Sequence, residues 1–173
     1  MLELLKLKDV GPAPTMEMEL ARRLNLITGD NGLGKSFLLD VAWWALTRTW
    51  ARQVVLPAAD ATKPTITYRY TKARPPGYSS SSTFHRKQEK WPVTTGRPAI
   101  PGLVLYAQVD GGFSVWDPAR NYWKKDSPDR PASYSFTASE VWDGNPLCEG
   151  LVRDWKFPRH QLQMGPIRFP FIF

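Results

Sequence analysis

Residues 29–36 carry the feature that most constrains this chain. Their sequence, Gly-Asp-Asn-Gly-Leu-Gly-Lys-Ser, fits the pattern G-x-x-x-x-G-K-[ST]. The motif follows a short apolar run at 24–28 and precedes a stretch from 36 to 52 that has no glycine or proline. We interpret the run as a strand buried on both faces and the stretch as a largely buried helix. A strand, a glycine-rich turn and a helix in this order predict a phosphate-binding P-loop.

Each residue type in the motif has a role in holding a nucleotide. Glycines at 29, 32 and 34 let the backbone curl until several N–H groups converge on one phosphate. Lys35 is expected to place its charge between the β- and γ-phosphates, and the Ser36 hydroxyl to ligate Mg²⁺. The N-terminus of the following helix adds a partial positive charge. The predicted ligands are ATP and Mg²⁺, and the predicted binding residues are Gly29, Asp30, Asn31, Gly32, Leu33, Gly34, Lys35, Ser36 and Phe37.

The segment 24–46, LNLITGDNGLGKSFLLDVAWWAL, resembles the N-terminal lobe of the ABC/SMC/RecF-type ATPases, which are grouped with the AAA family ATPases. In that family G-x-N-G-x-G-K-S follows a strand that ends an antiparallel β-layer. The resemblance extends over residues 1–50. It implies an α/β P-loop NTPase fold with a partly antiparallel β-layer, Mg·ATP as the ligand, and a homodimer of the intact protein that closes around two nucleotides.

The sequence departs from this family where hydrolysis is concerned. A Walker B strand has four apolar residues followed by Asp-Glu, whereas the nearest run, 103–110, contains Gln108 and is followed by Gly111. No signature like LSGGQ is found. In the family a Gln at a strand end contacts Mg²⁺ and water, and Gln108 is similar to it in order and setting, which implies a second Mg²⁺ ligand. We assign no catalytic residue and expect hydrolysis to require elements that this chain lacks.

Alternation and turn chemistry predict β-structure through much of the chain. Apolar and polar residues alternate at 2–8 and 16–20, and 65–71 is rich in Thr and Tyr. Asp110-Gly111-Gly112 separates two apolar runs, which predicts a hairpin. Further predicted elements are a short strand at 134–136, a capping box formed by Thr137 and Glu140, and a helix starting at Asn145-Pro146.

Composition divides the chain into three parts. We interpret residues 1–155 as the N-terminal lobe of a P-loop ATPase domain, apparently incomplete. Four consecutive serines and several prolines predict a basic, flexible excursion at 73–100. Residues 156–173 form an irregular basic tail with three prolines and no acidic residue. Such an ending is expected of a truncated or frame-shifted reading frame, or of a tail that docks on a partner.

The positive charge of the chain is concentrated in one segment. The net charge is +7, and residues 61–100 hold eight basic residues and one acidic residue. The ordinary interpretation is a solvated loop surface. One alternative is a nucleotide-sensing module that binds nucleic acid through 61–100, where aromatic residues are interleaved with the basic ones. A second alternative is a complete small P-loop kinase or GTPase, although the N-K-x-D motif that reads guanine is not found.

Several classes of protein are excluded by what the sequence lacks. Cys148 is the single cysteine and His85 and His160 are the two histidines, so neither an internal disulfide framework nor a Cys/His zinc site is expected. No run reaches the roughly 18–20 apolar residues of a membrane span, and the N-terminus lacks the apolar core of a signal peptide. We therefore expect a cytoplasmic protein with no membrane partner.

Overall fold

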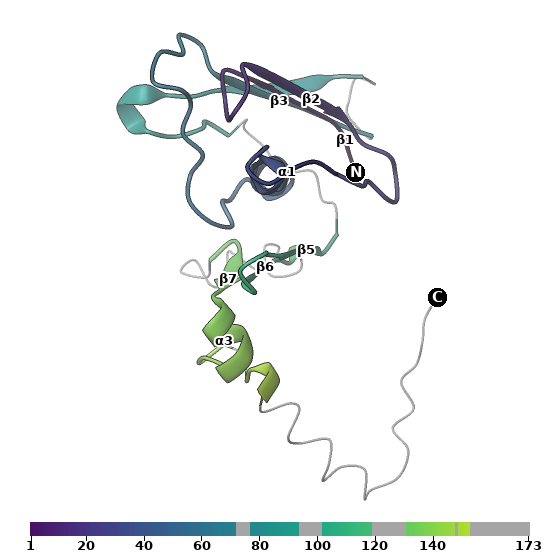
Figure 1. Cartoon of the computed structure of the whole chain (residues 1–173), viewed down its shortest axis with the longest axis vertical. Coiled ribbons are helices and arrows are strands. Elements are labelled where there is room, and N and C mark those ends of the chain that lie inside the picture. The colour runs from purple at the N-terminus through teal and green to yellow at the C-terminus, as the bar shows by residue number, and fades with distance from the viewer. Residues whose placement is uncertain (72–76, 94–101, 119–130, 148, 153–173) are drawn as a thin grey trace, which may run out of the picture. The chain divides into compact units, whose positions relative to one another are not determined.

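Antiparallel strands dominate the structure. The computed structural model describes residues 1–71, 77–93, 102–118, 131–147 and 149–152. The chain divides into two compact units, Met1–Val104 with Val115–Tyr134, and Leu105–Ser114 with Ser135–Phe173. Its strands form a four-stranded sheet in the order β2-β1-β3-β4 and a three-stranded sheet in the order β5-β6-β7 (Figure 1). Among the helices in the described ranges, none has the length and apolar character needed to cross a membrane.

The four-stranded sheet is built around β1 (Leu2–Lys8). On one side β1 pairs with β2 (Thr15–Glu19), and on the other with β3 (Thr65–Tyr70), both antiparallel. These strands confirm the predictions made from alternation. The adjacent Leu4 and Leu5 interrupt that alternation, and the β1–β3 register shifts between Leu2 and Leu4. The irregularity returns Leu5 and Leu7 to the buried face, which is how a bulge corrects the phase of a strand.

Helix α1 (Lys35–Thr47) covers one face of this sheet (Figure 1). Val41, Trp44 and Ala45 are buried against leucines of β1 and aromatic and aliphatic residues of β3. The helix predicted for 36–52 is therefore confirmed, but it ends earlier. Arg48 adopts a left-handed conformation with φ 61° and its N–H bonds the carbonyl of Trp44, which terminates the helix.

The predicted fold class is wrong. The structure is mostly antiparallel β with two sheets and little helix, and it is not a parallel α/β P-loop NTPase fold. The prediction depended on a buried strand at 24–28, yet this segment belongs to neither sheet. Leu24 and Leu26 are 81% and 84% exposed. An apolar run predicts burial only where a second surface packs on it, and no described segment does so here.

The irregular excursion predicted for 73–100 contains regular structure. Residues Ser79–Thr83 form β4, which pairs antiparallel with β3, and Arg86–Gln88 form a short 3-10 turn. Phe84 and Trp91 are buried in the core of the first unit. The serine run forms a strand, contrary to the prediction, because serine hydroxyls on an edge strand can hydrogen-bond side chains of the neighbouring strand. The hydroxyls of Thr67 in β3 and Ser81 in β4, for example, lie 2.8 Å apart. Residues 73–76 and 94–100 lie outside the described residues.

The second sheet follows the predicted hairpin. Its strands are β5 (Val104–Ala107), β6 (Phe113–Trp116) and β7 (Tyr134–Phe136). Helix α3 (Ala138–Asp143) comes next and has the predicted capping box, in which Thr137 accepts from the Glu140 N–H and Glu140 accepts from the Thr137 N–H. The helix predicted from Asn145 does not begin there, because Asn145 follows α3 and its amide donates to Glu140. Residues 151 and 152 are helical, and the predicted helix beyond them lies outside the described residues. The predicted tail, 156–173, lies outside the described residues.

Tyr70 joins the sheet to the helix, and its replacement tests the alkaline stability of the first unit. Its hydroxyl donates to the Ala45 carbonyl, and burial, with Tyr68 nearby, raises the pKa of this hydroxyl above its usual range. At neutral pH Tyr70→Phe should lower the free energy of unfolding by about 1 kcal/mol. Because the folded-state pKa is the higher one, Tyr70 stabilises the fold below pH about 10 and this contribution falls as the pH rises further.

The measurement is urea unfolding of wild type and Tyr70→Phe between neutral pH and the alkaline limit of the fold. The difference between the two proteins should shrink above pH about 10. Tyr78, which is 54% exposed, supplies the control Tyr78→Phe, for which no difference is expected. A Tyr70→Phe difference that stays constant across this range would contradict the assignment.

Candidate functional site

The glycine-rich loop before α1 depends on three left-handed or otherwise positive backbone angles. Gly29, Gly32 and Gly34 have φ angles of 143°, 85° and 86°. Other residues rarely adopt such angles, because a Cβ atom would collide with the backbone. Gly34 is also the N-cap of α1. The predicted glycine positions are therefore the points at which the chain turns into the helix.

Lys35 closes the loop on itself. Its Nζ atom donates hydrogen bonds to the backbone carbonyls of Gly29 and Asp30, each at 2.6 Å. The ammonium group therefore lies inside the turn formed by the motif. Carbonyl oxygens compensate a positive charge less well than phosphate oxygens do, so an incoming polyphosphate can replace them.

The first turn of α1 has free hydrogen-bonding groups. The N–H groups of Lys35, Ser36 and Phe37 have no acceptor within the described residues, as expected at a helix N-terminus without a side-chain cap. The Ser36 hydroxyl is exposed and likewise has no partner in this part of the chain. The Phe37 ring, in contrast, packs against the core, so Phe37 contributes only its backbone N–H to the loop. Unpaired N–H groups at a helix N-terminus and a nearby ammonium are the kinds of group that bind anions in other proteins.

The turn between β1 and β2 packs directly on this loop. A Cβ atom built on Gly34 would lie 2.7 Å from Cγ of Pro12, and one built on Gly11 would overlap the Phe37 ring. Gly11 has φ 91°, so both contact and conformation require glycine there. The sequence predicted a turn at Gly11-Pro12-Ala13-Pro14 but gave no sign that it packs on the glycine-rich loop.

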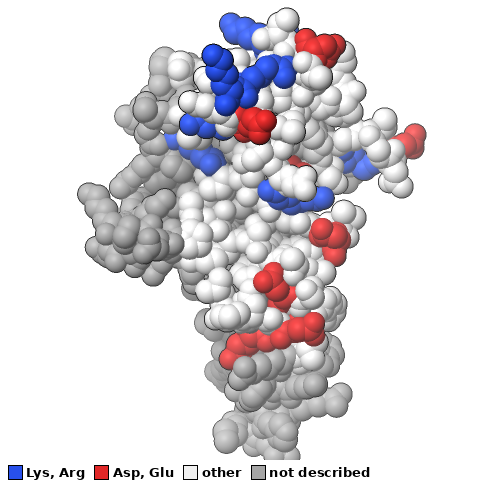
Figure 2. Space-filling model, turned by 90° about the vertical axis from the view of Figure 1, so that its left-hand side faces the viewer, with Lys and Arg blue, Asp and Glu red and all other residues white. Residues whose placement is uncertain are grey.

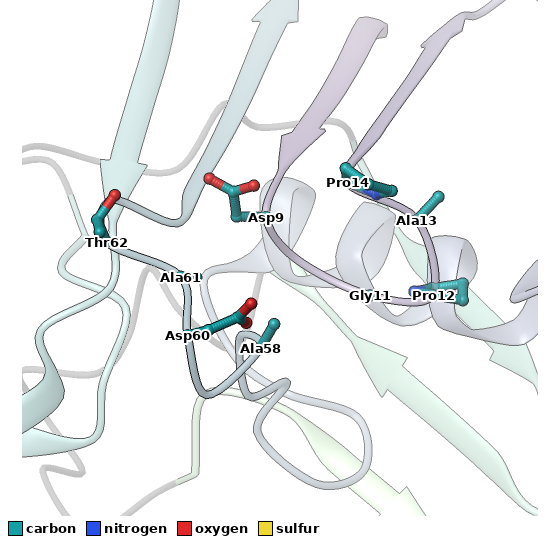
Figure 3. Close-up of a pocket in the computed structure, with 9 residues that line it drawn as sticks. All are labelled: Asp9, Gly11, Pro12, Ala13, Pro14, Ala58, Asp60, Ala61 and Thr62. Atoms are coloured by element: carbon teal, nitrogen blue, oxygen red, sulfur yellow. The ribbon is translucent and has the colours of Figure 1, made fainter.

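A hollow of about 400 Å³ lies beside this turn. Figure 3 shows the β1–β2 turn on one side and the loop 58–62 on the other, with the carboxylates of Asp9 and Asp60 between them. The lining residues are Asp9, Gly11, Pro12, Ala13, Pro14, Ala58, Asp60, Ala61 and Thr62. Pro12 also contacts Gly34, so the hollow and the glycine-rich loop are neighbours. Sequence reasoning missed the hollow, because Asp9 and Asp60 belong to no motif and meet only through the fold.

The predicted magnesium ligands differ in their setting. Ser36 lies in the first turn of α1 and is exposed. Gln108 belongs to the β5–β6 hairpin, where its amide donates to the Ser114 hydroxyl at 2.9 Å, and its role as a ligand stays a prediction. In the described ranges there is no group of three His, Cys, Asp or Glu side chains that could hold a metal. A magnesium ion held here would need phosphates and waters to complete its coordination, which is how Mg²⁺ usually binds nucleotides.

Basic side chains on the first unit are mixed with acidic ones. On the face drawn in Figure 2 both signs of charge are interspersed over this unit. Lys6 pairs with Glu17 at 2.7 Å, and Arg69 lies 3.5 Å from Glu3. These pairs reduce the positive potential that a nucleic-acid interface would need.

The residues 29–37 predicted from the motif thus form one continuous loop and helix start. Their arrangement is local in the chain and combines an ammonium group with amides and a hydroxyl that have no partner among the described residues. Comparison of the chain with protein-family models, with curated proteins and with solved structures gives no match.

Proposed function

We propose that this protein binds Mg·ATP through residues 29–37. The observation that carries the proposal is the position of the Lys35 ammonium, which is held inside the glycine-rich loop by the carbonyls of Gly29 and Asp30. It lies in the same segment as three amides that have no acceptor among the described residues. Positive charge and converging N–H donors are what a polyphosphate requires.

Different residues of the loop bind the phosphates and the magnesium ion. Lys35 neutralises the β- and γ-phosphates, and the amides at the start of α1 donate to their oxygens. Ser36 contributes its hydroxyl to Mg²⁺, which neutralises phosphate charge when bound. Asp30, Asn31 and Leu33 are exposed and contribute backbone rather than side chains to the loop.

The nucleoside is proposed to enter the hollow next to the β1–β2 turn. The hollow adjoins the loop through Pro12, and its volume of about 400 Å³ is in the range of small-molecule sites. Asp9 and Asp60 supply acceptors for ribose hydroxyls or for the amino group of adenine. The absence of N-K-x-D from the sequence favours ATP over GTP.

Binding, rather than turnover, is what these residues support. Hydrolysis requires a carboxylate that orients water, and no apolar strand in the sequence ends in Asp-Glu. The resemblance of 24–46 to ABC/SMC/RecF-type ATPases favours ATP as the nucleotide. A homodimer around two nucleotides remains part of that proposal.

Thermal unfolding with and without nucleotide tests the proposal. Mg·ATP at a hundred times its Kd should add about 2.7 kcal/mol to the free energy of unfolding, which corresponds to a rise in Tm of about 5–10 °C for a chain of this size. Mg·GTP at the same concentration is expected to give a smaller rise, and ATP with EDTA a smaller one still. An equal or larger effect of GTP would favour the GTPase alternative, and no effect of either nucleotide would contradict the proposal.

A further inference from the structure

We propose that Arg86 is a positioning residue that holds the nucleoside wall of the hollow and so sets the preference of the site for ATP over bare polyphosphate. The inference rests on the proposed function. Arg86 lies outside the glycine-rich motif, in the basic segment that the sequence assigned to a loop. Its side chain nevertheless reaches the loop that lines the hollow.

Arg86 forms two hydrogen bonds to one short turn, residues 58–61. Its Nη2 atom donates to the carbonyl of Ala58 at 2.9 Å and to that of Ala61 at 2.6 Å. The Ala61 N–H also bonds the Ala58 carbonyl, at 3.2 Å, which closes the turn. Asp60 lies inside this turn and lines the hollow. The guanidinium group therefore fixes the backbone on both sides of a carboxylate that faces the hollow.

The segment that carries Arg86 is itself well anchored. The backbone of His85 bridges to Lys90, and on either side of that bridge Phe84 and Trp91 are buried in the core. The Trp91 indole N–H donates to the Val55 carbonyl at 2.7 Å. The 84–91 turn therefore holds the chain at Val55 through Trp91 and at Ala58 and Ala61 through Arg86.

The turn at 58–61 has few other restraints. In the described ranges its backbone link to the opposite wall of the hollow is at its start, where Pro57 bridges to Val10. Ala58 and Asp60 are exposed, and no other side-chain hydrogen bond to this turn is found in the described part of the chain. Exposed turns with few contacts open readily. Without Arg86 the carboxylate of Asp60 loses its fixed position, whereas the phosphate loop keeps its own contacts to Lys35.

This separation gives a test with two probes, Mg·ATP and Mg·tripolyphosphate, the second of which has no nucleoside. Titration calorimetry of Arg86→Ala should show a loss of about fivefold in affinity for ATP, the worth of one net hydrogen bond, with the affinity for tripolyphosphate unchanged. Lys87→Ala removes the same charge from the same turn, and Lys87 makes no side-chain contact in the described residues. This control should leave both affinities unchanged.

A double-mutant cycle distinguishes positioning from direct contact. If Arg86 acts through Asp60, then Arg86→Ala should have little further effect on ATP affinity in the Asp60→Ala background. Arg86→Gln, which can keep one of the two hydrogen bonds, should fall between wild type and Arg86→Ala. Equal losses for ATP and tripolyphosphate, no loss for either, or additive effects of Asp60→Ala and Arg86→Ala would overturn the inference. A wild-type protein that binds neither probe would overturn the proposed function itself, a result distinct from all of these.

Discussion

Replacing Lys35 by alanine is expected to weaken Mg·ATP binding by a factor of about 100 or more. A hydrogen bond to a charged group contributes up to about 3 kcal/mol, and that free energy corresponds to a factor of about 100 in Kd. The estimate is a lower bound, because the ammonium faces both the β- and γ-phosphates in the proposed complex. No other side chain donates into the described loop, so nothing replaces the lost charge.

Titration calorimetry with wild type and Lys35→Ala measures this difference. The variant should fold, because the carbonyls of Gly29 and Asp30 that Lys35 leaves are exposed and can bond water. Far-UV circular dichroism checks that point. Lys90→Ala is the matched control, since Lys90 is exposed and its side chain has no hydrogen bond or ion pair within the described ranges. Equal ATP affinities in wild type and Lys35→Ala would remove the glycine-rich loop from the proposed site.

The strands and the helix of the first unit could be predicted because their signals are local. Alternation of leucine with charge in β1 corresponds to the burial pattern of that strand, with Lys6 and Lys8 exposed. The conformation of the glycine-rich loop was predictable for the same reason, since glycine conformations and one lysine define it. In both cases neighbours in the sequence are also neighbours in space.

The predictions failed where burial depends on distant partners. Residues 24–28 are apolar enough for a central strand, yet Leu24 and Leu26 are exposed because no described strand pairs with them. The serines of β4 look like a linker, yet β3 provides a pairing edge. Neither the exposure of residues 24–28 nor the pairing of β4 can be predicted from the segment's own sequence. An α/β P-loop NTPase fold with a partly antiparallel β-layer was inferred from a local motif, while the four-stranded sheet beside that motif is antiparallel throughout.

The hollow and the role of Arg86 beside it could not be predicted either, because they too depend on residues far apart in the sequence. Arg86 bonds carbonyls that lie 28 and 25 residues away, and backbone carbonyls carry no sequence signature. The positive charge of its segment instead favoured a solvated surface or a nucleic-acid interface. The one available signal was the pair of aromatic residues around the turn, since Phe84 and Trp91 reach the core and thereby fix Arg86.

Replacing Trp44 by alanine is expected to cost the first unit about 3–5 kcal/mol of its free energy of unfolding, the range observed for large aromatic residues in cores. Trp44 is 2% exposed and lies at the centre of the contact between α1 and the sheet. Its ring stacks on Trp50 at 5.6 Å between centroids and meets Tyr68 edge-on at 5.8 Å. Each aromatic pair adds about 0.5–1.5 kcal/mol to the burial of apolar area.

Urea unfolding followed by far-UV circular dichroism measures this loss without depending on tryptophan fluorescence. Leu39→Ala is the matched control, because Leu39 lies on the same helix and is 44% exposed, and it should cost less than about 1 kcal/mol. The free energy of unfolding of a typical domain is about 5–15 kcal/mol, so Trp44→Ala removes a large share of the stability. A loss for Trp44→Ala as small as that for Leu39→Ala would mean that α1 does not depend on this ring to hold its place on the sheet. The first turn of α1, and with it Lys35 and Ser36, would then need another anchor.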